Sequence, residues 1–195
     1  MLIVKNSVSC ANVMGGYFVA EEFIEQHPDM AALHPESVNT IRIYTLRHND
    51  EVVVFHPWMR IGRGKSVVDN ASAGGIGAVL DFDSGRIVAS GDKKGHAYID
   101  ETDNGIKLNG YQIPLWNEVI SFARELASID PELHYAGWDV AIIQDGCSLV
   151  EVNPRAQIGF QIFDERGLRY DLDKCLKQFN LFEKYYKERS CRKVK

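Results

Sequence analysis

Hydrophobic and polar positions alternate in short runs along most of the chain, which is typical of β-strands. This pattern predicts strands at 17–24, 39–46 and 52–59, a turn at 81–86 and a hairpin within 137–155, whose two apolar runs are joined by Gln144-Asp145-Gly146. Apolar residues at helical spacing predict helices over 115–129 and over about 172–187. Runs of strands with few helices favour an α+β fold.

Several polar residues of the predicted hairpin fall at positions that share one face of a strand. Glu151 and Asn153 are two residues apart and therefore share a face, and pairing across the turn can bring Asp139 beside them. Three hard oxygen donors suit Mg²⁺, which takes one or two carboxylates and completes its shell with water and phosphate oxygens. The alternative is a solvated outer face of an amphipathic hairpin. Arg155, which follows directly and can hold phosphate, favours a site.

Composition limits the classes of function. The chain has 195 residues, a net charge of −5, 45% hydrophobic and 25% charged residues, which is typical of a soluble globular protein and gives no electrostatic footprint for nucleic acid. No apolar run is long enough to span a bilayer, and the start of the chain does not resemble a signal peptide. Four scattered cysteines are expected to be reduced thiols of a cytoplasmic protein, and neither they nor the histidines have zinc-ligand spacing.

A cationic loop and a glycine pair form the second informative region. The segment Gly64-Lys65-Ser66 resembles the end of a P-loop, but that motif requires glycine where this chain has Met59. Arg60 and Arg63 remain as candidates for binding an anionic group, whereas Lys65 is expected to be a solvated surface residue. Downstream, the spacing of Asn70, Gly74 and Gly75 allows the backbone to approach a ligand closely.

Taken together, Gly-Trp-Asp at 137–139 and Glu-Val-Asn-Pro-Arg at 151–155 resemble the metal-binding end of an ATP-grasp ligase. The closest group is the sugar-transfer-associated, alpha-L-glutamate-ligase-like branch, over roughly residues 17 to 165. The resemblance implies the C-terminal lobe of an ATP-grasp fold, a largely antiparallel sheet with flanking helices. It also implies three parts: a remnant of the small lobe and hinge strand at 1–24, a catalytic lobe at 25–170, and a C-terminal helix with a basic tail at 171–195.

The resemblance also implies roles for individual residues. The adenine slot would be lined by Glu21, Glu22, Phe23 and Ile24. The transferring phosphoryl group would be stabilised by Arg155, with Arg42 and Arg60 or Arg63. The acyl-phosphate or acceptor would face Asn70, Gly74 and Gly75, and the metal bridging the phosphates would be held by Asp139, Glu151 and Asn153.

The reaction implied by the resemblance uses Mg-ATP to activate a small-molecule carboxylate as an acyl-phosphate, which an amine or similar nucleophile attacks. A sugar-linked or peptide-like acceptor in cell-surface polysaccharide synthesis is the expected context. The chain departs from the family pattern, because no lysine-bearing strand or glycine-rich loop precedes Tyr17, Asn39-Thr40 replaces the acidic ribose-binding residue, and 100–105 lacks the usual His-Pro-x-Thr-Gly-like stretch. Three alternatives therefore stay open: a ligase of which this is the C-terminal part or a shortened homologue, with a partner chain or a further N-terminal lobe; a non-catalytic nucleotide-binding or partner module; or a structural β domain.

Overall fold

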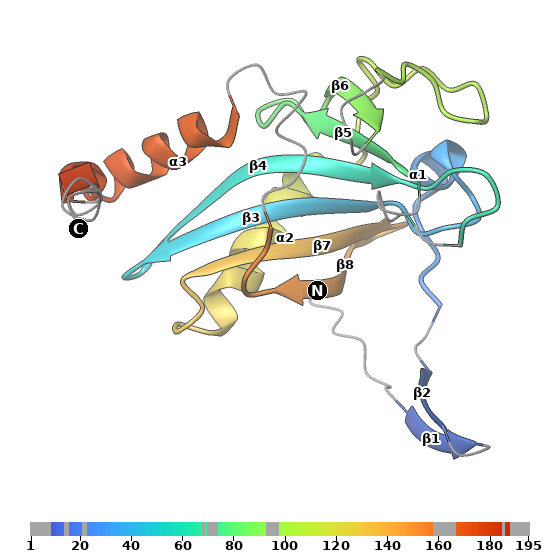
Figure 1. Cartoon of the computed structure of the whole chain (residues 1–195), viewed down its shortest axis with the longest axis horizontal. Coiled ribbons are helices and arrows are strands. Elements are labelled where there is room, and N and C mark those ends of the chain that lie inside the picture. Colours follow the sequence, from blue (N-terminus) through green and yellow to red (C-terminus); the bar gives the residue numbers. More distant parts are fainter. Residues whose placement is uncertain are drawn as a thin grey trace, which may run out of the picture.

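The computed structural model describes residues 23–67, 69, 74–92, 98–157, 167–184 and 186–187, together with the backbone of 9–13 and 16–20. Its centre is an antiparallel sheet of order β6-β5-β4-β3-β7-β8 (Figure 1). These strands are β3 (Thr40–His48), β4 (Glu51–Ile61), β5 (Ile76–Leu80), β6 (Ile87–Asp92), β7 (Tyr135–Ile143) and β8 (Gly146–Asn153). A separate hairpin, β1 (Ser9–Val13) and β2 (Gly16–Ala20), stands apart from this sheet in Figure 1. The predicted α+β class with a largely antiparallel sheet is confirmed.

The main core lies between one face of the sheet and α2 (Trp116–Ile129). The apolar stripe predicted for this helix is buried, and it packs on β3, β4, β7 and β8. Alternate residues of the central strands point at it, among them Ile41 and Ile43 of β3 and Val140 of β7. Each such side chain contributes roughly 1.5–3 kcal/mol by leaving water. Since these positions face α2, the residues between them face the other side of the sheet.

Two further helices are shorter than α2. The short helix α1 (Pro28–Leu33) adds Met30 and Leu33 to the same core. The other, α3 (Gly167–Gln178), packs on β4. The helix expected over 172–187 is interrupted, because Asn180 adopts a left-handed conformation with φ of 57° and the Leu181 amide donates back to the Leu176 carbonyl at 2.7 Å. No helix in the described part of the chain is long and apolar enough to cross a membrane.

Strand β4 bends in its middle. Arg42 of β3 pairs with Trp58 and Tyr44 pairs with Phe55, so His56 and Pro57 form a bulge, with φ of 47° at His56. Strand β5 pairs only with the later half of β4, from Trp58 to Ile61. Among the described residues, the earlier half of β4 therefore has no strand on that side, a position that tolerates Pro57.

Candidate functional site

The register of the central strands gathers charged residues on the sheet face opposite α2. Arg42 of β3 lies directly across from Asp139 of β7, and Asp139 lies across from Glu151 of β8. On the other side of β3, Thr40 pairs with Arg60 of β4. Directly opposed residues of neighbouring strands project to the same face, so four strands contribute to one polar surface.

Asp139 is the centre of this surface and is fully buried. The Arg42 guanidinium donates from Nε to Oδ1 and from Nη2 to Oδ2, the latter at 2.8 Å. Arg60 places Nη2 2.6 Å from the same Oδ2. Burial alone would lower the pKa of Arg42, but the hydrogen bond and charge of Asp139 outweigh it and leave that pKa above its usual value. The two arginines thus neutralise a carboxylate that would otherwise be costly to bury.

A second buried carboxylate, Asp69, extends the cluster. Its Oδ2 accepts the Thr40 backbone amide at 3.0 Å and the Thr40 hydroxyl, and lies 3.6 Å from Nε of Arg60. Burial raises the pKa of Asp69, against the opposing effects of Arg60 and the Thr40 hydrogen bonds. Asp69 therefore joins the loop after β4 to the start of β3 at the point where Arg60 enters the site.

Glu151 and Asn153 line the β8 side of the same face. Glu151 is exposed, while Asn153 is half-buried and its Nδ2 has no hydrogen-bond partner among the described residues. The described part of the chain contains no group of three or more His, Cys, Asp and Glu residues that could hold a metal, and the predicted set consists of two carboxylates and one amide.

These donors fit a divalent cation in number and charge. A carboxylate has about four lone-pair positions, and three guanidinium N–H groups approach those of Asp139, which leaves one on Oδ1. Arg42 and Arg60 contribute two positive charges against three negative charges from Asp69, Asp139 and Glu151, a net charge of −1. The surface can therefore accept a cation beside Glu151 and Asn153 without adding to an excess of positive charge.

The segment after β8 is fixed by aromatic hydroxyls. Tyr44 donates to the Gln157 carbonyl at 2.9 Å and accepts from Nε1 of Trp58, and Tyr135 donates to the Ala156 carbonyl at 3.0 Å. This segment passes so close to Gly137 that a Cβ there would lie 2.5 Å from Cβ of Ala156. Arg155 is exposed just before this segment.

The remaining predicted residues lie around this centre or outside the described chain. Arg63 is half-exposed and pairs with Asp103 of the 98–110 loop at 3.2 Å, and Asp103 also accepts the Gly64 amide at 2.7 Å. That amide is the main cause of the lowered pKa of Asp103, with Arg63 adding to it. Phe23 is 85% exposed, and Ile24 is half-buried. Gly74 has φ of 96° and Gly75 is buried at the start of β5, whereas Glu21, Glu22 and Asn70 lie outside the described residues.

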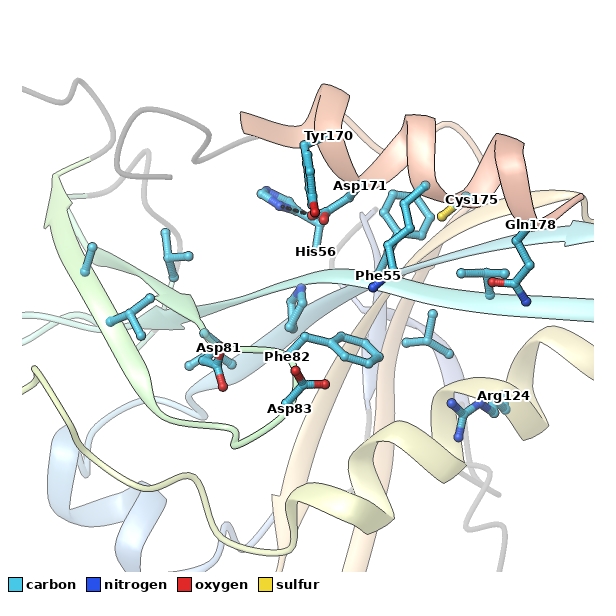
Figure 2. A pocket seen from close by; sticks show the side chains of 18 of the residues that line it. Phe55, His56, Asp81, Phe82, Asp83, Arg124, Tyr170, Asp171, Cys175 and Gln178 are labelled. Carbon is cyan, nitrogen blue, oxygen red and sulfur yellow. Dashed lines mark ion pairs between the residues drawn. The ribbon is translucent and has the colours of Figure 1, made fainter. Parts of the chain in front are cut away.

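A separate cavity of about 700 Å³ lies at the unpaired half of β4 (Figure 2). It is bounded by the β5–β6 turn, by Arg124 of α2 and by α3, where Asp171 lies 3.4 Å from Nδ1 of His56. Its lining includes none of the residues predicted for phosphate or metal binding. The charged cluster and this cavity are therefore different places in the molecule.

Sequence reasoning missed two members of the cluster, Thr40 and Asp69. Thr40 is two residues before Arg42 on the same strand face, which is a usable signal. Asp69 directly precedes Asn70 in a stretch already singled out for its glycines. Its proximity to β3 could not be read from the chain, because it depends on how the loop folds back over the sheet.

Comparison with known families identifies the family of the chain. A family model described as sugar-transfer associated ATP-grasp matches residues 6–177, which is most of the chain. No curated protein and no solved structure matches the sequence.

Proposed function

Because the chain belongs to the sugar-transfer associated ATP-grasp family, we propose that it binds Mg-ATP on the polar sheet face around Asp139 and transfers the γ-phosphoryl group to a carboxylate. The observation that carries this proposal is the convergence of Arg42 and Arg60 on a fully buried Asp139. Two guanidinium groups held by one carboxylate present N–H donors of fixed direction, which suit phosphate oxygens.

In the proposed reaction, an oxygen of the substrate carboxylate attacks the γ-phosphorus of ATP, and ADP leaves. The resulting acyl-phosphate is attacked at its acyl carbon by an amine or similar nucleophile, and inorganic phosphate leaves with the electrons of the broken C–O bond. A small-molecule acid and a sugar-linked or peptide-like acceptor in polysaccharide synthesis are the proposed substrates. Positioning and charge neutralisation account for most of the catalysis in phosphoryl transfer of this kind.

Within this scheme, Arg42 and Arg60 hold the transferring phosphoryl group, and Arg155 or Arg63 approaches from the exposed rim. Phe23 and Ile24, with Glu21 and Glu22, are proposed for the adenine, and Asn70 with Gly74 and Gly75 for the acyl-phosphate or acceptor.

A magnesium ion, when bound, would neutralise charge on the phosphates. Glu151, the side-chain oxygen of Asn153 and the remaining Oδ1 lone pair of Asp139 are the proposed ligands, and the net charge of the cluster supports this assignment.

A nucleotide-binding module without ligase activity is the second candidate. The exposure of Phe23, at 85%, favours it, because an adenine slot needs a wall on both sides and this side chain is covered by little of the described chain. For either candidate, a partner chain or a further lobe would complete the slot. A cytoplasmic location is proposed for either candidate.

Calorimetry with Mg-ATP tests nucleotide binding directly. We expect binding by the wild-type chain and its loss in Glu151→Gln, and also in Asp139→Asn under conditions where circular dichroism shows that this destabilised variant is folded. Absence of binding by the wild type contradicts the proposal. Release of ADP in the presence of candidate acids and amines then separates a ligase from a binding module.

A further inference from the structure

We propose that Thr40 and Asp69 are positioning residues that lock the guanidinium of Arg60, with Nε and Nη2 held by Thr40 and Asp139, so that Nη1 faces the transferring phosphoryl group. The inference rests on the proposed function, and it adds two residues and a role that the family match does not assign.

The Thr40 hydroxyl has a fixed direction. Its oxygen accepts from Nε of Arg60 at 3.0 Å and from Nη2 at 2.9 Å. A hydroxyl has a single proton, and here that proton is donated to Oδ2 of Asp69. Asp69 therefore decides which way the Thr40 lone pairs point, and those lone pairs hold Arg60.

The Arg60 guanidinium is held along two of its three nitrogens. Nε binds Thr40, and Nη2 binds both Thr40 and Asp139. Among the described residues no partner engages Nη1, so its two N–H groups form the edge available to an anion. A planar fork fixed at Nε and Nη2 cannot rotate, and Nη1 consequently keeps one direction.

The negative charge of Asp69 indicates a role beyond attaching the loop after β4 to the sheet. A neutral side chain would suffice to accept the Thr40 amide and hydroxyl, and it would be less costly to bury than a carboxylate. The charge of Asp69 is used where it lies, 3.6 Å from Nε of Arg60. With Asp139 at the other end, the guanidinium lies between two buried carboxylates and is restrained along its length.

Four variants test this arrangement. Asp69→Asn keeps the shape but removes the charge, Thr40→Val removes only the hydroxyl, and Thr40→Ser restores it. Asp50→Asn is the matched control, because Asp50 is an exposed carboxylate 3.8 Å from Arg47. The readouts are the Kd values for Mg-ADP and for Mg-ADP with aluminium fluoride, a mimic of the transferring phosphoryl group, together with urea unfolding.

We expect Asp69→Asn and Thr40→Val to weaken binding of the aluminium fluoride complex by about tenfold or more, because each loosens a donor aimed at the developing charge. Binding of Mg-ADP alone should stay within about twofold, and Thr40→Ser should recover the wild-type ratio between the two ligands. Where assayable, ADP release should show the loss in kcat rather than in KM for ATP.

Equal weakening of both ligands, or an unchanged ratio in Thr40→Val, overturns the inference and leaves the proposed function standing. A wild-type chain that binds neither ligand overturns the proposed function first. Thr40→Val keeps the test decisive if Asp69→Asn does not fold, since valine matches threonine in shape.

Discussion

Arg42 and Asp139 are direct cross-strand partners on β3 and β7, and the guanidinium of Arg42 contacts both carboxylate oxygens of Asp139. This two-point contact holds the two side chains in one geometry at the centre of the sheet. It also makes the polar face rigid where ligand binding is proposed.

Replacing Asp139 with Asn should destabilise the fold strongly. The substitution leaves Arg42 and Arg60 without their buried counter-charge, and breaking a buried pair in this way costs about 3–5 kcal/mol. Urea unfolding at neutral pH measures the change. Asp145→Asn, at the exposed turn of the same hairpin, should change the free energy of unfolding by less than about 0.5 kcal/mol. Equal stability of the two variants would contradict the role given to Asp139.

Glu151→Gln should separate binding from folding. Glu151 is exposed and has no ion pair among the described residues, so its charge contributes little to stability. We expect an unchanged melting temperature and loss of the Mg²⁺-dependent part of nucleotide affinity, measured by calorimetry with and without the metal. Glu125→Gln, exposed on α2, serves as the control on the far face. A metal dependence equal to that of the wild type would remove Glu151 from the proposed ligands.

Substitutions at Gly137 and Ala156 should have coupled effects on the free energy of unfolding. A Cβ at Gly137 would lie 2.5 Å from Cβ of Ala156 and 3.2 Å from Cδ of Arg42, so Gly137→Ala displaces the segment after β8 or the Arg42 stem. Overpacking of this kind costs about 1–3 kcal/mol. The double variant Gly137→Ala, Ala156→Gly removes the clashing atom and should recover part of that loss. A double-mutant cycle in urea checks it, and strict additivity would show that the clash is relieved elsewhere.

The buried thiols should resist alkylation. Burial raises the pKa of Cys147 to about 12 and that of Cys175 to about 11, so neither forms appreciable thiolate in the folded protein at pH 8. Iodoacetamide should leave both unmodified until urea unfolds the chain, as mass spectrometry would show. Cys10→Ser with Cys191→Ser provides the background, because the side chains of those two cysteines lie outside the described residues. Rapid labelling without denaturant would contradict the burial.

Asp103 should make the attachment of its loop pH-dependent. Its pKa in the folded protein is lowered, chiefly by the Gly64 amide, so its contribution to stability is present above the unfolded pKa and is lost as pH falls through the folded value. The difference in unfolding free energy between wild type and Asp103→Asn should therefore shrink on acidification below the ordinary carboxyl range. Asp100→Asn, which replaces an exposed carboxylate of the same loop, is the matched control variant. A difference that is constant with pH would exclude this linkage.

Local pattern was sufficient for most of the fold. The hairpin of β7 and β8 and the helix α2 follow from spacings of two and of three or four residues, which need no knowledge of the remaining chain. The same alternation places Glu151 and Asn153 on one face, and the register sets Asp139 opposite Glu151.

Other features depend on distant parts of the chain. The approach of Arg60 to Asp139 requires β3 to lie between β4 and β7, a sheet order that the spacing of residues does not specify. The bulge at His56 could not be predicted from the sequence, because the residue with positive φ is not a glycine. The roles proposed for the individual site residues stay predictions, because geometry places a side chain without naming its ligand.

The sheet order has a consequence for synthesis of the protein. Arg42 and Asp139 are 97 residues apart in the chain, so at ordinary ribosomal rates about 5–20 s pass between their appearance. During that interval the guanidinium groups of β3 and β4 have to remain hydrated, since their buried anion does not yet exist. The final tertiary closure of the nascent chain therefore waits for β7, and truncated translation products ending before it are expected to be targets for chaperones and proteases.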